Sequence, residues 1–362
     1  KTFQDPLKKL TARALMTLLA CSPAAQNHAA KAGLIDSCVE QMKQTHSQLH
    51  LESVRPSKAA HRKKEESHLK EVKLTVEILR SALYRNDECK AVATDARLTL
   101  ALHALWPWLL LGDPSMEAVL ELLCVYTANF TTACSTLCAS GPGIASGPKC
   151  SLGNSLMHSV MKLASGVAPD NSTIQKLAFS LLANLAMSRD CRGLLQKTNF
   201  LQAFPLMPAP KAGGVKAASA GCGGGSLLGL WLRLLVNLSF AEDGQQSILR
   251  VSGALELLVD LAQHRRHALL TLHNLCFCPT NKPHVIANEQ MIDLFISWLS
   301  TQMFLIHLSN FPSKAKTALK CPSVRLKIEE AYTASKKGMK NEEPMSTYLL
   351  KCLENLSQLL NN

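Results

Sequence analysis

One motif recurs along this chain and limits what it can fold into. An apolar, helix-like run ends in Asn-Leu, and a Gly or Asn follows fourteen to sixteen residues later. We call these two positions the asparagine slot and the glycine slot. The clearest copies pair Asn184 with Asn199, Asn237 with Gly253, and Asn274 with Asn288. An earlier copy has Thr17 in the asparagine slot and Gly33 in the glycine slot, and weaker copies contain Asn129 and Asn355.

The motif has a physical explanation. A Gly or Asn tolerates the left-handed backbone of a tight turn between helices. The next helix begins with apolar residues because it must bury them against the preceding unit. No unit of this kind covers its own apolar face, so copies stack on one another. We therefore expect an all-α fold, specifically an α-solenoid (a superhelix of helical repeats) with flexible loop insertions.

Composition agrees with this fold class. Hydrophobic residues make up 47% of the 362 residues, but aromatic residues only 5%, and the apolar set is dominated by Leu and Ala. Leu and Ala lose little side-chain entropy in a helix, whereas strand-rich domains draw more on β-branched and aromatic residues. The sequence has no long stretch of alternating apolar and polar residues, which a half-buried strand would need.

Shifts in composition divide the chain. The predicted segments are a repeat at 1–52, a basic linker at 53–68, helical repeats at 69–138, a Gly/Pro loop at 139–153, a repeat at 154–204, a Gly/Pro-rich disordered insertion at 205–226, two repeats at 227–300 and C-terminal helices at 301–362. Between Trp298 and Pro312 the pattern departs from an amphipathic repeat helix. Because the chain begins at Lys1 inside a helical pattern, we expect it to be a piece of something larger.

The charge balance bears on partners. Lys and Arg number 39 against 27 Asp and Glu, a net charge of +12. The bases are interrupted by acids and not interleaved with aromatic residues, which favours a solvated helix face over nucleic-acid binding. A membrane span is not predicted, because the longest apolar stretch, 98–111, is too short and contains Pro107. The 13 cysteines are irregularly spaced and typical of a reducing compartment.

Nothing in the sequence predicts catalysis, a metal or a cofactor. His273, Cys276, Cys278 and His284 lie close together, but they lack the paired Cys spacing of zinc sites and fall at a helix end. Helix packing is therefore the favoured interpretation. The glycine run 221–225 lacks the Gly-Lys-Ser/Thr ending of a phosphate-binding loop. The chain is predicted not to be an enzyme.

The repeated motif resembles the armadillo family. In that family each repeat has three helices, and an Asn on the third helix lines a groove. Its amide donates and accepts hydrogen bonds together and so grips the backbone of an extended peptide. The resemblance implies this role for Asn184, Asn237 and Asn274, and loosely for Asn129. The alternative is that these side chains only hold neighbouring helices in register.

A closer resemblance is carried by 234–246, 272–283 and 314–320. These segments are similar to the C-terminal region of very large armadillo-like proteins of centrioles and ciliary basal bodies. The resemblance implies a protein-interaction scaffold in centriole assembly and ciliogenesis, with a role in left-right axis specification. Its partners would be other proteins, and its location the cytoplasm and cytoskeleton, at the centrosome and basal body. The alternative is an armadillo-type adaptor in transport or adhesion that grips an extended peptide.

Overall fold

The computed structural model describes residues 6–53, 60–139, 155–166, 173–206, 227–262 and 264–288, together with 290, 291, 294, 326 and 333. It divides into two compact units. Unit one comprises Lys1–Phe200 and Ser219–Leu230, and unit two comprises Leu201–Ala218 and Trp231–Asn362.

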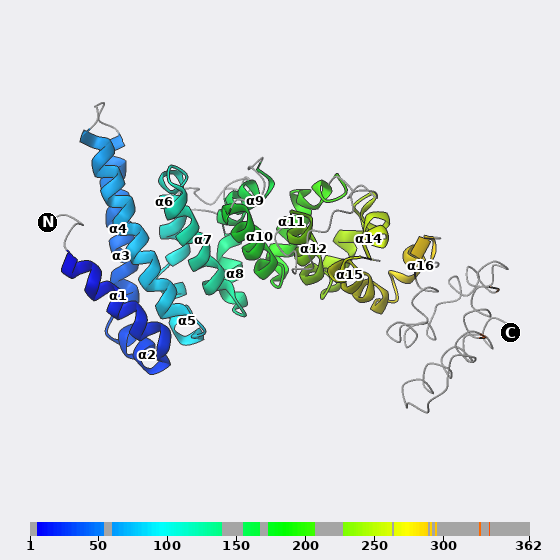
Figure 1. Ribbon diagram of the computed structural model, residues 1–362, viewed down its shortest axis with the longest axis horizontal. Helices are drawn as coiled ribbons and strands as arrows, with labels where there is room; N and C mark the ends of the chain where they lie inside the picture. The colour runs from blue at the N-terminus through cyan, green and yellow to red at the C-terminus, as the bar shows by residue number, and fades with distance from the viewer. Residues whose placement is uncertain are drawn as a thin grey trace, which may run out of the picture. The chain divides into compact units, whose positions relative to one another are not determined.

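Unit one is built from helices that follow one another closely (Figure 1). They are α1 (Pro6–Cys21), α2 (Pro23–Lys31), α3 (Leu34–Ser53), α4 (Ala60–Leu83), α5 (Asp87–Asp95), α6 (Leu98–Leu109), α7 (Asp113–Thr127), α8 (Thr131–Cys138), α9 (Leu156–Ser165), α10 (Thr173–Leu185) and α11 (Arg189–Lys197).

These helices pack in rows in which every third helix meets the next. In what we call the α1 row, α1 packs on α4, α4 on α7 and α7 on α10. In the α2 row, α2 packs on α5, α5 on α8 and α8 on α11, while α3 packs on α6. The row contacts place against each other helices that lie about 45 to 65 residues apart in sequence. Unit one is thus a stack of three-helix repeats, as the resemblance to the armadillo family implies.

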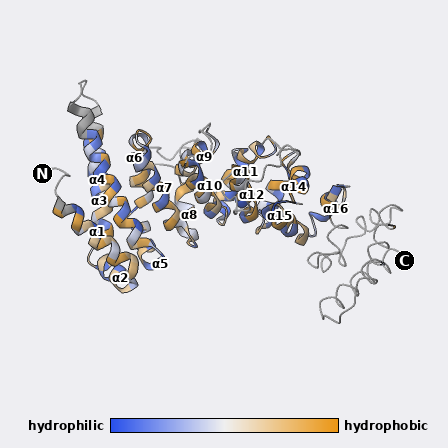
Figure 2. Cartoon of the chain, viewed as in Figure 1, coloured by the Kyte–Doolittle hydropathy of each residue, from blue (hydrophilic) through white to orange (hydrophobic). Residues whose placement is uncertain are grey.

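Apolar residues spaced along each helix explain why the rows form. Leu79 of α4, Leu120 of α7 and Phe179 of α10 are each at most 1% exposed. Burying a side chain of this size contributes about 2 kcal/mol relative to leaving it in water. Figure 2 shows hydrophobic and hydrophilic residues alternating around the same helices. Each helix therefore has apolar residues to bury against its neighbours.

The glycine slots confirm the predicted turns at three positions. Gly33 and Gly253 have φ of +80°, and Asn199 has φ of +54°. Each precedes a new helix or helical turn. Asn288 differs, since its Oδ1 accepts a hydrogen bond from the Met291 N–H at 3.0 Å, the arrangement of a helix N-cap.

The predicted basic linker at 53–68 is wrong over most of its length. Ser53 is the last residue of α3, and α4 already begins at Ala60. Ala, Lys, Arg and Glu dominate the stretch 59–66, and all are strong helix formers. Their intrinsic preference makes this segment the first turns of a long helix.

The chain continues through the 3-10 turn η1 (Phe200–Ala203) and then α12 (Leu227–Leu238), α13 (Glu242–Leu249), α14 (Ala254–Ala262), α15 (Arg266–Phe277) and α16 (Lys282–Ile286). In unit two, α14 packs on α13 and α15, and α15 on α16. Trp231 is 2% exposed and lies 6.1 Å, centroid to centroid, from the ring of Phe204.

Several predicted segments lie outside the described residues. They are nearly all of the loop 139–153, the insertion 205–226 and the C-terminal helices 301–362, together with the departure at 298–312. In the part of the chain that is described, no helix combines the length and apolarity needed to cross a bilayer.

Candidate interaction surface

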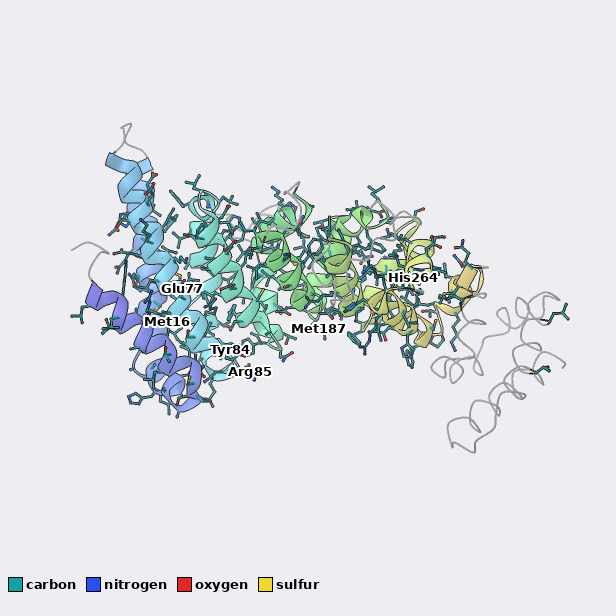
Figure 3. The ribbon with its side chains drawn as sticks, viewed as in Figure 1. Met16, Glu77, Tyr84, Arg85, Met187 and His264 are labelled. Atoms are coloured by element: carbon teal, nitrogen blue, oxygen red, sulfur yellow. The ribbon has the colours of Figure 1, made fainter. Side chains whose placement is uncertain are left out.

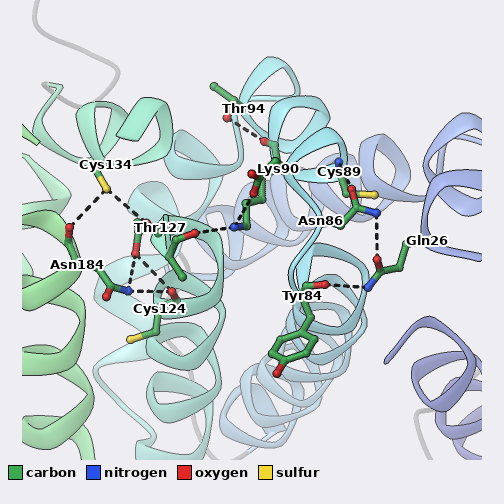
Figure 4. A network of polar contacts seen from close by, with 12 residues as sticks. Gln26, Tyr84, Asn86, Cys89, Lys90, Thr94, Cys124, Thr127, Cys134 and Asn184 are labelled. Carbon is green, nitrogen blue, oxygen red and sulfur yellow. Dashed lines mark hydrogen bonds and ion pairs between the residues drawn. The ribbon is translucent and has the colours of Figure 1, made fainter. Parts of the chain in front are cut away.

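Asn184, the clearest asparagine-slot residue of unit one, joins two helices of the α1 row. It lies near the end of α10, and its Nδ2 donates to the Cys124 carbonyl at 3.0 Å and to the Thr127 Oγ1 at 3.3 Å (Figure 4). The last carbonyls of a helix lack partners within that helix. Asn184 thus adds a donor at the end of α7, where the Cys124 carbonyl also accepts from the Ala128 N–H. Among the described residues, nothing donates to its Oδ1, which stays available as an acceptor.

Asn274 does the same in unit two. It lies on α15, and its Nδ2 donates to the Ser239 Oγ at 2.8 Å, just beyond the end of α12. Its Oδ1, too, receives no hydrogen bond from the described residues. Asn237 lies on α12 and is half-buried. These contacts have the geometry expected for holding repeats in register, and contact with a peptide remains a prediction for all three residues.

Asn129 lies elsewhere. Helix α7 ends at Thr127, and Asn129 is an exposed turn residue with φ of +56°. The side chain that meets Asn184 is the buried hydroxyl of Thr127. The motif placed the asparagine slot two residues too late here, because Asn is favoured in left-handed turns as well as in that slot. Its role as a partner-binding residue is a prediction about a turn, not about a helix.

A second set of helix-end contacts was missed by sequence reasoning. Gln26, on α2, is 2% exposed, and its Nε2 donates to the carbonyls of Ser81 and Tyr84 at 2.9 and 3.1 Å. Its Oε1 accepts from the Asn86 Nδ2 at 3.0 Å. Asn86 is also the N-cap of α5, where its Oδ1 accepts from the Cys89 N–H. The Gln26–Asn86 pair therefore supplies donors to the carbonyls at the end of α4 and an acceptor to an N–H group at the start of α5.

Unit two repeats this arrangement. Gln245, on α13, donates through Nε2 to the carbonyls of Ser239 and Asn274 at 2.8 and 3.2 Å. Its Oε1 accepts from the Nδ2 of Asn281, the fully buried residue that precedes α16. The signal in the sequence is a Gln in an early helix followed by an Asn at the start of a later one. It was hidden because the two residues are 60 positions apart in one copy and 36 in the other.

Other helices of the α2 row use different side chains for the same task. Lys90, on α5, is 3% exposed, and its Nζ donates to the Ala128 carbonyl at 2.7 Å and to the Asp87 Oδ1 at 3.0 Å. Cys134, on α8, directs its Sγ at the carbonyl of Asn184, 3.9 Å away. In each case a side chain of the α2 row contacts the end of the next helix in the α1 row (Figure 4).

The cysteines in this region pack in the interior. Burial raises the pKa of the Cys134 thiol to about 12, and a hydrogen bond with Cys138 together with burial raises the pKa of the Cys191 thiol. The Sγ atoms of Cys138 and Cys191 are 2.9 Å apart. High thiol pKa values disfavour the thiolate that nucleophilic chemistry needs. Within the described part of the chain, no three His, Cys, Asp or Glu side chains are grouped to hold a metal ion.

Exposed large side chains gather where helices of the α1 row end. In unit one, Tyr84 follows α4 and is 45% exposed, and Met187 follows α10 and is 52% exposed (Figure 3). Tyr84, Arg85, Lys90 and Asn129 line a cavity of about 690 Å³. Tyr84 is the exposed aromatic side chain of this lining, and aromatic side chains are frequent anchors of protein interfaces. This surface is the candidate interaction site of unit one.

Comparison with known proteins agrees with the helical arrangement. No family model matches the chain. It is 46% identical over its whole length to rotatin of Homo sapiens and 44% identical over 99% of it to rotatin of Mus musculus. It spans only 17% of the length of these relatives.

Solved structures show the fold. An engineered protein superposes with a TM-score of 0.62 over 98% of this chain and 76% of its own, at 14% identity. A designed armadillo repeat protein in complex with the peptide (KR)4 superposes with a TM-score of 0.50 over 75% of this chain and 95% of its own, at 13% identity. The predicted fold class, an all-α armadillo-like solenoid, is confirmed.

Proposed function

Because this chain is an armadillo-like repeat protein that resembles rotatin, we propose that it serves as a scaffold in the assembly of centrioles and ciliary basal bodies. The coarser conclusion, a protein-interaction scaffold, follows from the fold and the similarity together. The proposed location is the centrosome and basal body, and the proposed consequence is a role in ciliogenesis and left-right axis specification. The single observation that carries the proposal is 46% identity over the whole chain.

The structure supports a scaffold because its surface features are distributed along the chain. Tyr84 and Met187 in unit one, and Phe240 and Phe277 in unit two, are exposed by 45% to 65% at the ends of different helices. Several modest contacts of this kind bind an extended partner without any one deep pocket. A non-enzymatic role fits the same features, since the buried polar groups described above are engaged in helix-end contacts.

Localisation tests this proposal. A tagged full-length protein containing this chain should form foci at centrioles in dividing cells and at basal bodies in ciliated cells. Deleting residues 1–362 should reduce the foci or the fraction of ciliated cells. A matched control replaces the segment with a designed armadillo repeat protein of similar size. Diffuse staining of the full-length protein, or full rescue by the control, would refute the proposal.

A second candidate function is an adaptor that grips an extended peptide. The observation that favours it is the Oδ1 of Asn184 and of Asn274, which receives no hydrogen bond from the part of the chain that the structure describes, while each side chain is held in place through its own Nδ2. The net charge of +12 disfavours a basic ligand such as the (KR)4 peptide of the designed protein. Peptide binding should therefore be screened with neutral and acidic peptides. The variant with Asn184, Asn237 and Asn274 changed to Ala, if folded by circular dichroism, should lose that binding; unchanged affinity would exclude the adaptor.

A further inference from the structure

A groove between α1 and α4 is lined mainly by basic side chains. The two helices pack against each other in the α1 row. Between them lies a cavity of about 280 Å³, lined by Lys9, Arg13 and Met16 of α1 and by Lys70, Lys73, Leu74 and Glu77 of α4. We call this cavity the α1–α4 groove. Figure 3 shows Met16 and Glu77 where the two helices meet.

The groove is strongly cationic. Among the described residues, its lining has four basic side chains and one carboxylate, Glu77. Glu77 already pairs with Lys73 at 3.9 Å. Arg13 and Lys70 are exposed and have no ion-pair partner among the described residues. Uncompensated charges lining a cavity focus the electrostatic field there and attract ligands of opposite sign.

The amide grip of the asparagine slot is missing at this groove. Thr17 occupies the slot on α1, and its Oγ1 donates to the Arg13 carbonyl of its own helix at 3.0 Å. Near the end of α4, the Ser81 Oγ donates likewise to the Glu77 carbonyl at 3.2 Å. Neither side chain offers both a donor and an acceptor to a peptide backbone. A ligand of this part of the row must be recognised through side-chain charge.

The lining also decides between classes of ligand. Met16 and Leu74 are half-buried and supply an apolar patch beside the charges, which suits a segment with a few apolar side chains. Among the described residues, no aromatic side chain lines the groove, so this lining offers no platform on which nucleic-acid bases would stack. A recessed site between two helices fits a chain segment better than the flat surface of a bilayer.

We propose that the α1–α4 groove binds an acidic segment of a partner protein. Asp or Glu side chains of the partner lie against Arg13 and Lys70, and an apolar side chain lies on Met16 and Leu74. This inference rests on the proposed scaffold function, because it names the chemistry of one partner for the same repeat surface. It adds a ligand class and a site that the similarity to rotatin does not assign.

The test compares two double variants of the whole chain that lose the same charge. Arg13→Ala with Lys70→Ala alters the groove. Lys162→Ala with Lys197→Ala removes two exposed bases on α9 and α11 and is the control. The probe is a fluorescein-labelled 14-residue peptide of Asp and Glu with two Leu, and its Gln/Asn counterpart is the neutral reference. Fluorescence anisotropy gives the affinities.

The groove variant should bind the acidic probe about tenfold more weakly, since each exposed ion pair contributes up to about fivefold in affinity. The control should change by less than about twofold, and the neutral peptide should bind poorly to all three proteins. Equal losses in both variants would show that only net charge matters and would overturn the proposal. It would equally be overturned if the groove variant lost binding to oligo-dT or to anionic vesicles but not to the peptide.

The two proposals fail separately. If the groove variant still binds the probe while the full-length protein forms centriolar foci, the groove is wrong and the scaffold stands. If the full-length protein is diffuse but the groove variant alone loses the probe, the centriolar role is wrong and the acidic-segment site stands.

Discussion

Replacing Asn86 by Ala removes a side chain that serves two helices at once. Asn86 is 7% exposed and Gln26 is 2% exposed, so water cannot readily replace the lost contacts. The Ala variant loses the N-cap of α5, which costs about 1 kcal/mol. It also leaves the Gln26 Oε1 buried without a donor, which costs about 1–3 kcal/mol. The predicted loss of local stability is therefore about 2–4 kcal/mol.

Hydrogen exchange measured by mass spectrometry reports this loss where it occurs. Amides of α2, α5 and the end of α4 should exchange about 30- to 700-fold faster, because 1.4 kcal/mol corresponds to a factor of ten. Amides of α13 and α15 in unit two should keep their rates, since a repeat contacts only its neighbours.

Asn86→Ser separates the two contributions. The Ser Oγ still accepts from the Cys89 N–H as a cap, but it does not replace the hydrogen bond that the Asn86 Nδ2 donates to the Gln26 Oε1. It should therefore be more stable than the Ala variant by about 1 kcal/mol. Exchange in α2 and α5 that changes less than about twofold in the Ala variant would refute the reasoning. Identical behaviour of the Ser and Ala variants would refute the capping contribution alone.

Three further predictions concern other parts of the chain. Asn281→Ala should destabilise unit two by about 1–3 kcal/mol, measured by hydrogen exchange of α13 and α15, because it leaves the buried Gln245 Oε1 without its donor; wild-type exchange rates there would contradict this. Gly33→Ala, at φ of +80°, should lower the melting temperature, whereas Gly112→Ala, at φ of −152°, should lower it less, and equal shifts would count against backbone strain as the cause. Burial raises the folded-state pKa of the Cys134 thiol from about 9 to about 12. The buried neutral thiol therefore contributes fully to stability below pH 9, and this contribution is lost as pH rises from 9 towards 12, by about 1 kcal/mol at pH 10. Cys134→Ala should therefore show a shallower fall in stability between about pH 8 and 10, measured by urea titration.

The sequence by itself determined the repeat and its turns. Gly33, Gly253 and Asn199 adopt the left-handed backbone that the glycine slot predicts. The turns could be predicted because a positive φ is a local requirement that few residue types meet. Arg97 also has a positive φ, +64°, at the turn before α6, although Arg has no preference for this conformation that would have predicted the turn. There the packing of the flanking helices imposes the turn.

Helix content was predictable for the same local reason, but its limits were not. The charge of the stretch 53–68 indicates a linker, whereas the helix propensity of its residues indicates a helix. The structure is helical from Ala60 on, so helix propensity was the better guide. Asn129 shows the opposite failure. The motif placed it on a helix, while the structure ends that helix at Thr127 and gives the contact with Asn184 to a hydroxyl.

Only the tertiary structure decided which side chains meet. Gln26 contacts Asn86 across sixty residues, Lys90 contacts the carbonyl of Ala128, and Arg13 and Lys70 come to line one groove. The carbonyls at a helix end need donors, but their chemistry does not specify which repeat supplies them or whether the donor is Gln, Lys or Cys. That choice depends on how helices from successive repeats stack. The repeat pattern in the sequence therefore predicts the fold, whereas the helix-end contacts and the lining of the groove depend on how the helices stack.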